Sequence, residues 1–358
     1  MELIRVLVVD DSAFMRKMIT TMLEKDPAIK VIGTAKNGRD AIDLVGELKP
    51  NIVTMDIEMP IMDGLSALEA IMEKSPVPVI MVSSLTTEGA EATLRALDLG
   101  ALDFIAKQTS FVSTDIVKIE QELIQKVKMF ARKSTPERYR LHRPASEQRT
   151  PVTSKPVQRS VSPPPSAPSA RRSSKAKVVA IGTSTGGPPA LQAVLTKLPK
   201  TTPVPILIVQ HMPPAFTGPL AKRLDSLCAI DVKEAVSGDR VKSGLALLAP
   251  GGKHMTIKNG TVRITDEPSD TLHRPSVDIM AQSVVDEYGS ATLGVIMTGM
   301  GNDGVKAFKN IHGKGGSIIA QSGDTCVVYG MPRAVIEANL QTEIANLQDI
   351  AARIQNYW

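Results

Sequence analysis

The sequence predicts two α/β domains joined by a flexible connector, and three observations lead to this fold class. The 358 residues exceed the size of one typical domain, roughly 150 residues. Short apolar runs alternate with helical patterns in both halves of the chain. Residues 135–175 differ in composition from everything around them. We therefore expect one domain over residues 1–134 and a second over residues 176–358.

The first domain contains five near-continuous apolar runs, which are typical of buried parallel strands. Amphipathic segments lie between the runs, and a last one covers Asp115–Phe130. We expect a five-stranded parallel sheet with helices on both faces, whose ligands bind at the carboxyl ends of the strands. The predicted strands are Ile4–Val9, Val31–Ala35, Ile52–Met55, Val79–Val82 and Asp103–Ala106.

The second domain begins in the same way, with a buried strand, a glycine-rich turn and a helix that runs through Leu198. In its middle, Asp231–Thr265 consists of short alternating pieces, and the Asn259-Gly260 pair is a strong hairpin signal. We therefore expect a doubly wound α/β domain with an antiparallel excursion. The predicted strands outside the excursion are Val178–Ile181, Val204–Val209, Thr292–Met297 and Ser317–Ala320.

The connector, residues 135–175, contains eight prolines and many serines and lacks apolar periodicity. Such a segment cannot bury enough surface to offset its ordering entropy, so we expect a flexible linker. Its nine Lys/Arg and two Glu give a charge of +7, whereas the whole chain carries +5. The basic charge therefore belongs to the linker and not to a folded face, which argues against nucleic-acid binding.

Composition also excludes other classes of protein. Cys228 and Cys326 are the two cysteines and lie far apart, which excludes a disulfide scaffold and a multi-cysteine zinc site. The N-terminal residues lack the basic start of a signal peptide. No apolar stretch approaches the ~18 residues of a membrane span. We expect a soluble, cytoplasmic protein that is not inserted in a membrane.

Polar residues stand at strand ends in the first domain. Asp10 and Asp11 end the first predicted strand and Asp56 ends the third, so three carboxylates converge on one sheet edge. Such a cluster is unfavourable without a cation, and its oxygen ligands suit Mg²⁺. Ser83 and Lys107 end the fourth and fifth strands and could hold phosphoryl oxygens. Taken singly, each acid is better explained as a helix cap or a solvated loop residue, but suitable chemistry at every strand end except the second is much harder to explain in that way.

The segments VLVVDDSAFMRK, VTMDIEMPIMDGLSAL, PVIMVSSL and LGALDFIAKQ resemble the receiver domain of two-component response regulators, which has a flavodoxin-like fold. The resemblance implies that Asp56 is the phospho-acceptor and that Asp10 and Asp11 bind Mg²⁺ with it.

The same resemblance implies that Ser83 is the switch hydroxyl, Phe104 the switch aromatic and Lys107 the phosphate-sensing base. The sequence departs from the family where Gln108 replaces the usual proline, so we expect the loop after Lys107 to differ.

A glycine-rich turn in the second domain suggests nucleophilic catalysis. Gly182 to Gly186 fits the pattern G-x-S-x-G, which exposes a serine, here Ser184, between a strand and a helix. The helix N-terminus beyond it favours an oxyanion. Two other interpretations remain open at this stage: a helix N-cap at Thr183, Ser184 or Thr185, and a phosphate-binding loop. The Walker lysine is absent.

A nucleophilic serine needs a base, and the base needs an orienting acid. His211 directly follows a predicted strand, so it should share the carboxyl edge of the sheet with Ser184. Asp303 lies in a glycine turn after another strand. Each could instead be a surface or capping residue. The other histidines are less well placed: His142, His254, His273 and His312.

The segments IGTSTGGPPAL, IVQHMPPAFTGPLAKRLD, LAPGGKHM, HRPSVD and TGMGNDG resemble the catalytic domain of chemotaxis protein-glutamate methylesterases. The resemblance implies Ser184 as nucleophile, His211 as general base and then acid, and Asp303 as its orienting partner. It also implies that Met300 and Thr185 stabilise the oxyanion. His254, His273 and Arg274 would shape the substrate groove or the domain interface.

The function implied by this resemblance is hydrolysis of glutamate γ-methyl esters on the cytoplasmic domains of chemoreceptors. Deamidation of receptor glutamines is a further activity of some family members. The esterase chemistry needs no cofactor. The receiver would inhibit the catalytic domain until a chemotaxis histidine kinase phosphorylates Asp56. A DNA-binding regulator and a nucleotide-binding domain are the competing classes, and the sequence offers neither a helix-turn-helix nor a Walker lysine.

Overall fold

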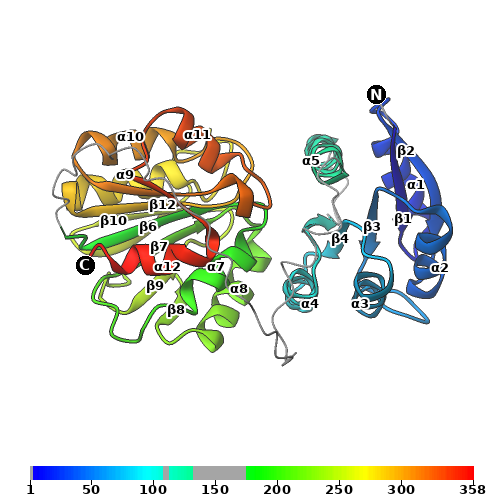
Figure 1. Cartoon of the computed structure of the whole chain (residues 1–358), viewed down its shortest axis with the longest axis horizontal. Helices are drawn as coiled ribbons and strands as arrows, with labels where there is room; N and C mark the ends of the chain where they lie inside the picture. Colours follow the sequence, from blue (N-terminus) through cyan, green and yellow to red (C-terminus); the bar gives the residue numbers. More distant parts are fainter. Residues whose placement is uncertain (1–2, 108–112, 132–174) are drawn as a thin grey trace, which may run out of the picture.

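The computed structural model describes residues 3–107, 113–131 and 175–358, which form two α/β domains (Figure 1). Two expectations lie outside these residues: the loop at Gln108, and the linker at 135–175 apart from its last residue. Within the described ranges, every helix is too short or too polar to cross a membrane.

The N-terminal domain is a parallel sheet in the order β2-β1-β3-β4-β5. All five predicted strands are present, and β2 begins two residues earlier than expected. Because β1 lies between β2 and β3, the chain changes direction across the sheet beside β1, where such folds bind ligands. The elements are β1 (Ile4–Val9), α1 (Ala13–Leu23), β2 (Ile29–Ala35), α2 (Gly38–Leu48), β3 (Ile52–Asp56), α3 (Gly64–Lys74), β4 (Val79–Ser84), α4 (Thr87–Asp98), β5 (Asp103–Lys107) and α5 (Ser113–Ala131).

Four helices of this domain begin after an N-cap residue whose side chain satisfies a backbone N–H group of the first helical turn. The side chain of each capping residue accepts a hydrogen bond from the backbone N–H three residues later. Ser12 caps α1 in this way, so the capping role falls on it and not on Asp11. The capping residues are Ser12, Asn37, Asp63 and Thr86.

The C-terminal domain is a seven-stranded parallel sheet in the order β14-β13-β12-β6-β7-β9-β8. Helices α7, α8 and α12 pack on one face, and α9, α10 and α11 pack on the other (Figure 1). The elements are β6 (Val178–Thr183), α7 (Gly187–Leu195), β7 (Ile206–Gln210), α8 (Pro214–Leu227), β8 (Asp231–Glu234), β9 (Leu245–Leu248), β10 (His254–Lys258), β11 (Thr261–Thr265), α9 (Val277–Tyr288), β12 (Thr292–Ile296), α10 (Val305–Gly313), β13 (Ser317–Gln321), α11 (Met331–Glu337), β14 (Glu343–Ala345) and α12 (Leu347–Gln355).

The antiparallel excursion is present but smaller than the sequence suggested. Among the strands that the structure describes, only β10 and β11 pair antiparallel, around a turn in which Asn259 and Gly260 both have positive φ. The earlier strands β8 and β9 instead extend the main sheet in parallel. The reason is visible in β9, whose four residues are all buried and all apolar, as expected of a strand covered on both faces.

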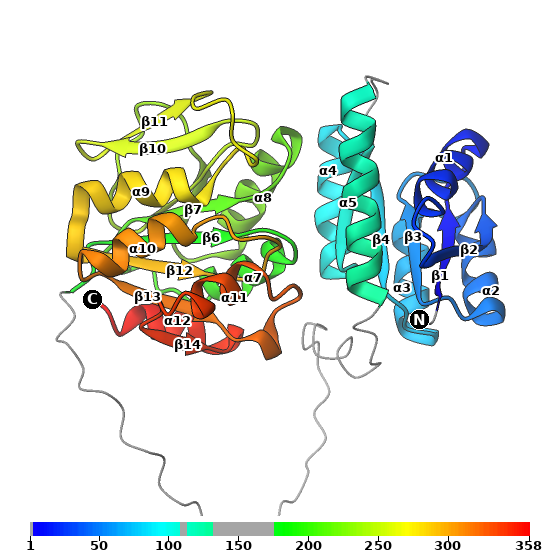
Figure 2. The same cartoon turned by 90° about the horizontal axis from the view of Figure 1, so that it is seen from above.

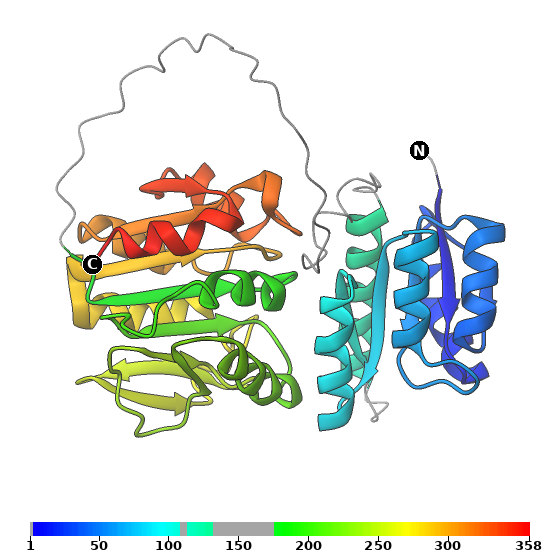
Figure 3. The same cartoon turned by 60° about the horizontal axis from the view of Figure 1, so that its bottom comes forward.

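The two domains pack against each other through α4 of the N-terminal domain and α8 of the C-terminal domain (Figures 2 and 3). At this interface the rings of Phe104 and Phe216 stack with centroids 4.5 Å apart. Beside them, Arg223 forms an ion pair with Asp98. Val328 from the loop before α11 also joins an apolar cluster of the N-terminal domain. The contacts therefore lie at the carboxyl edge of the seven-stranded sheet.

Candidate active site and phosphorylation site

The sheet register brings three predicted residues to one edge. Thr183 at the end of β6 pairs with Gln210 at the end of β7, so Ser184 and His211 follow at equivalent positions on adjacent strands. On the other side of β6, β12 leads into the loop that carries Asp303. Strand β6 is where the chain switches direction across the sheet, the usual place for a ligand site in this architecture.

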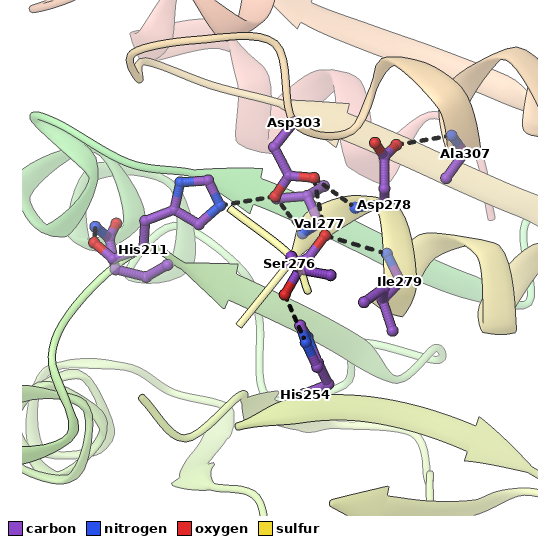
Figure 4. A network of polar contacts seen from close by, with 10 residues as sticks. His211, His254, Ser276, Val277, Asp278, Ile279, Asp303 and Ala307 are labelled. Carbon is purple, nitrogen blue, oxygen red and sulfur yellow. Dashed lines mark hydrogen bonds and ion pairs between the residues drawn. The ribbon is translucent and has the colours of Figure 1, made fainter. Parts of the chain in front are cut away.

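Asp303 and His211 form the central polar contact of this edge (Figure 4). Nε2 of His211 lies 2.8 Å from Oδ2 of Asp303, and each side chain is 9% exposed. Asp303 also accepts hydrogen bonds from Ser276 Oγ at 2.9 Å and from the backbone of Val277 and Asp278 at 2.7 and 3.1 Å. These donors form the N-terminus of α9, whose dipole favours a carboxylate.

The electrostatics of Asp303 follow from these contacts. Burial by itself would raise the pKa of Asp303. The hydrogen bond and charge of His211, together with the α9 amides, outweigh burial and bring the pKa down from 3.8 to about 2. The carboxyl group is therefore ionised across the range in which histidine titrates. A fixed carboxylate at Nε2 orients the imidazole ring of His211.

A second imidazole lies against His211. The ring of His273 stacks on it with centroids 4.2 Å apart and an interplanar angle of 15°. Burial, together with the neighbouring His211, lowers the pKa of His273 to about 4. At neutral pH the stacked ring is therefore uncharged. Among the described residues, Nδ1 of His211 is buried and has no hydrogen-bond partner.

The turn at Ser184 is fixed by its backbone. The Ser184 N–H donates to Thr298 O at 3.0 Å, and its carbonyl accepts from Gly187 N at 2.8 Å. Gly186, with φ of 74°, is the N-cap of α7 and makes no side-chain bond. The capping interpretation of Thr183, Ser184 or Thr185 is therefore wrong. A Cβ on Gly299 would lie 2.8 Å from Cβ of Ser184, so a glycine is needed where these loops meet.

The remaining predicted residues of this domain occupy different environments. Thr185 is buried, and Met300 is half-buried beside Gly299. His254 is buried and its Nε2 contacts Pro268 O at 3.2 Å and Thr271 Oγ1 at 3.1 Å, so it anchors the loop after β11. Arg274 is exposed. The part of Thr185 and Met300 in binding an oxyanion stays a prediction.

The carboxyl edge of the first sheet gathers the predicted acidic residues. Carboxylate oxygens of Asp10, Asp11 and Asp56 lie within 4.8 Å of one another. Nζ of Lys107 lies 2.9 Å from Asp10 Oδ2 and 2.7 Å from Asp56 Oδ2. Burial raises the pKa of Asp56 to about 6, against the lowering effect of Lys107. A donor set made only of carboxylate oxygens fits Mg²⁺, which would favour their ionised form.

Ser83 and Phe104 both lie on the side of the N-terminal domain that faces the interface. Ser83 Oγ accepts a hydrogen bond from Thr93 Oγ1 of α4 at 2.7 Å and donates to Gly89 O at 3.1 Å. Phe104 is 8% exposed and stacks on Phe216 of the other domain. In this conformation the Ser83 hydroxyl bonds to α4.

Sequence reasoning missed three residues that support these sites: Ser276, Gln210 and Thr93. Ser276 was detectable, because a serine before the α9 pattern signals an N-cap. Gln210 and Thr93 act through bonds to distant residues, which local patterns do not reveal.

Comparison with known proteins gives matches over nearly the whole chain. Residues 179–354 match the model of the CheB methylesterase family, and residues 6–117 match the response regulator receiver domain. A protein-glutamate methylesterase/protein-glutamine glutaminase from Oleidesulfovibrio alaskensis is 50% identical over 99% of both chains. One from Nitratidesulfovibrio vulgaris is 52% identical over 99% of both. The crystal structure of the Thermotoga maritima CheB methylesterase catalytic domain is 41% identical, with a TM-score of 0.49, and the match covers 51% of this chain and 98% of that one.

Proposed function

Since this chain belongs to the CheB methylesterase family and carries a response regulator receiver domain, we propose that it is a protein-glutamate methylesterase whose activity is controlled by phosphorylation. Its substrates would be glutamate γ-methyl esters on the cytoplasmic domains of chemoreceptors. The same site would deamidate receptor glutamines. The observation that carries the proposal is the His211–Asp303 pair, aligned by the sheet register with Ser184.

In the proposed reaction, Ser184 Oγ attacks the ester carbonyl carbon and its proton passes to Nδ1 of His211. This nitrogen is the one turned away from Asp303, and it has no other partner within the described part of the chain. The protonated imidazole then gives its proton to the departing methoxide, which leaves as methanol. Water, activated by the same nitrogen, hydrolyses the acyl-enzyme to free glutamate and restores Ser184.

The oxyanion formed in each step needs donors that are not already used. The Ser184 N–H is excluded because it donates to Thr298 O. Thr185 and Met300 follow β6 and β12, the two adjacent strands at the switch point. We assign them to the oxyanion for this reason, and each such donor is typically worth about 10²–10³ in kcat.

Regulation would begin at Asp56, where Asp10, Asp11 and Asp56 would hold Mg²⁺. When bound, the ion neutralises charge on an incoming phosphoryl group. Lys107 already bridges Asp10 and Asp56 and would contact the new phosphoryl oxygens. Ser83 and Phe104 connect this edge to α4 and to Phe216, so phosphorylation would loosen the domain interface and open the esterase site.

Methanol release from methylated receptor membranes tests both parts of the proposal. The wild type and Ser184→Ala are compared with and without Mg²⁺ and a small phosphodonor. Release that rises with the phosphodonor and disappears in Ser184→Ala is the expected result. Release that ignores the phosphodonor would refute the regulation, and undiminished release by Ser184→Ala would refute the assignment of the nucleophile.

A further inference from the structure

A row of buried, neutral polar side chains lies directly beneath the esterase site. Its members stand at or just after the carboxyl ends of four adjacent strands, β13, β12, β6 and β7. All are at most 2% exposed. The side chain of Gln210 bonds directly to the backbone of Ser184 and His211, and that of Thr183 bonds to Thr298 O. Gln321 instead bonds to Thr298 N and to Thr325 O. The four residues are Gln321, Thr298, Thr183 and Gln210.

Gln210 alone in this row bonds to two of the proposed triad residues. Its Nε2 donates to Ser184 O at 2.9 Å and to His211 O at 3.0 Å. The carboxamide orientation is determined by its partners, because the reverse orientation would place Oε1 against two carbonyl oxygens. One NH₂ group therefore ties the backbone of the nucleophile to the backbone of the base.

The surroundings hold the carboxamide at this position. Gln210 Oε1 is buried and has no hydrogen-bond partner among the residues that the structure describes, so the side chain is not placed there to satisfy its own oxygen. A Cβ on Gly187 would lie 1.9 Å from Oε1 and 2.6 Å from Thr183 Oγ1. The glycine at the start of α7 therefore leaves the space that the carboxamide occupies.

We propose that Gln210 is a positioning residue of the esterase, which sets the separation and orientation of Ser184 and His211. The inference rests on the proposed function, since it assigns the geometry of that reaction. Gln210 is 2% exposed and lies under the loops, so it touches no substrate. It acts on catalysis only through the two carbonyl groups that it binds.

The test variant is Gln210→Met, which keeps the length and volume of the side chain but removes both N–H donors. Because misplacement by ~1 Å costs about 10²-fold in rate, we expect kcat per active site to fall roughly ten- to a hundredfold. KM should stay within about twofold, since only groups that touch substrate contribute uniform binding.

Gln321→Met is the matched control. Gln321 is also a buried glutamine at the end of a strand, but its bonds go to Thr298 N at 2.8 Å and Thr325 O at 2.8 Å. It should lose stability to a similar degree and keep most of its rate per site. Gly187→Ala approaches the question differently, because it displaces the carboxamide while favouring the helix. It should reproduce the kcat loss, together with a loss of stability from overpacking the buried Gln210 and Thr183 side chains.

Active sites are counted by labelling Ser184 with a fluorophosphonate, and methanol release is then expressed per labelled site after activation by Mg²⁺ and a phosphodonor. A low kcat with unchanged KM in Gln210→Met and Gly187→Ala, but not in Gln321→Met, supports the proposal. Equal rates per site in Gln210→Met and the wild type, or an equal loss in Gln321→Met, would overturn it. Absence of label and of methanol release in the wild type would instead refute the proposed function.

Discussion

Nε2 of His211 lies 2.8 Å from Oδ2 of Asp303, and this contact determines which ring nitrogen can serve as a base. With a carboxylate at Nε2, the neutral ring carries its proton there and leaves Nδ1 unprotonated. Asp303 is in turn fixed by three donors at the start of α9. The tautomer of the base is thus set by a helix that contributes no residue to the proposed triad.

Asp303→Asn should reduce kcat by about 10³–10⁴-fold. The new amide would turn its NH₂ toward Nε2, which moves the ring proton to Nδ1 and leaves no base for Ser184. Methanol release measures the loss. Asp278→Asn is the control, because Asp278 Oδ1 accepts from Ala307 N at 2.9 Å and its side chain does not bond to His211. Equal losses in the two variants would contradict the tautomer argument.

Stability of the catalytic domain should fall as the pH drops from about 6.5 toward 4. Burial and His211 depress the pKa of His273 from 6.5 to about 4, so in this window the unfolded chain binds a proton that the folded chain does not. The effect is absent above pH 6.5, grows as the pH falls through this window and is complete below about pH 4. Burial lowers the pKa of His254 as well, and it acts in the same direction.

His273→Phe keeps the stacked ring and removes the titrating group, so its stability should depend less on pH in this window. The single tryptophan, Trp358, packs against the core of the catalytic domain and reports its urea unfolding midpoint. Asp303 contributes little above pH 5, because its linked loss of stability is centred between its ordinary pKa of 3.8 and its folded pKa of about 2. Parallel pH profiles for the two proteins would rule out His273 as the source.

Reversing one charge at the domain interface should raise the unstimulated esterase rate. Arg223→Asp places a carboxylate beside Asp98, its present ion-pair partner. We expect a roughly two- to fivefold increase, because a partly exposed ion pair contributes about 0.2–1 kcal/mol. Adding Asp98→Arg restores the pair with reversed signs and should return the rate to the wild-type level. An increased rate that persists in the double variant would argue against this contact as an inhibitory one.

Thr93→Val should make the enzyme respond to less phosphodonor. Thr93 Oγ1 holds Ser83 Oγ at 2.7 Å, and a net hydrogen bond is worth about 1 kcal/mol. Its loss should lower the phosphodonor concentration that gives half-maximal methanol release about fivefold. Thr54→Val is the control, because Thr54 is equally buried and its hydroxyl has no hydrogen-bond partner among the described residues. A similar shift in both variants would exclude the Ser83 bond as the cause.

Much of the fold was predictable because strand and helix periodicities are local. All five strands of the first domain appear, as does the hairpin at Asn259-Gly260. The pairing of β8 and β9 was not predictable, since direction within a sheet depends on which distant strand lies alongside. The short edge strand β14 was missed because three residues carry no periodicity.

The residues of the site also fall into a group that could be predicted from the sequence and a group that could not. Ser184, His211 and Asp303 stand at strand ends, a position that can be read from sequence once a parallel sheet is assumed. Their supports cannot be read in this way. Gln210 reaches Ser184 across 26 residues, and Ser276 reaches Asp303 across 27. Such contacts arise only when the chain has folded.

The stacking of Phe104 on Phe216 also has a consequence for recognition. The α4 side of the receiver is occupied by this protein's own catalytic domain. Any partner that binds this side must compete with an occupant covalently attached to it, so its apparent affinity is scaled down by the fraction of molecules that are open. A partner selective for the open arrangement would in turn increase that fraction. Binding of the partner and the esterase rate would then both report the same equilibrium between docked and open domains.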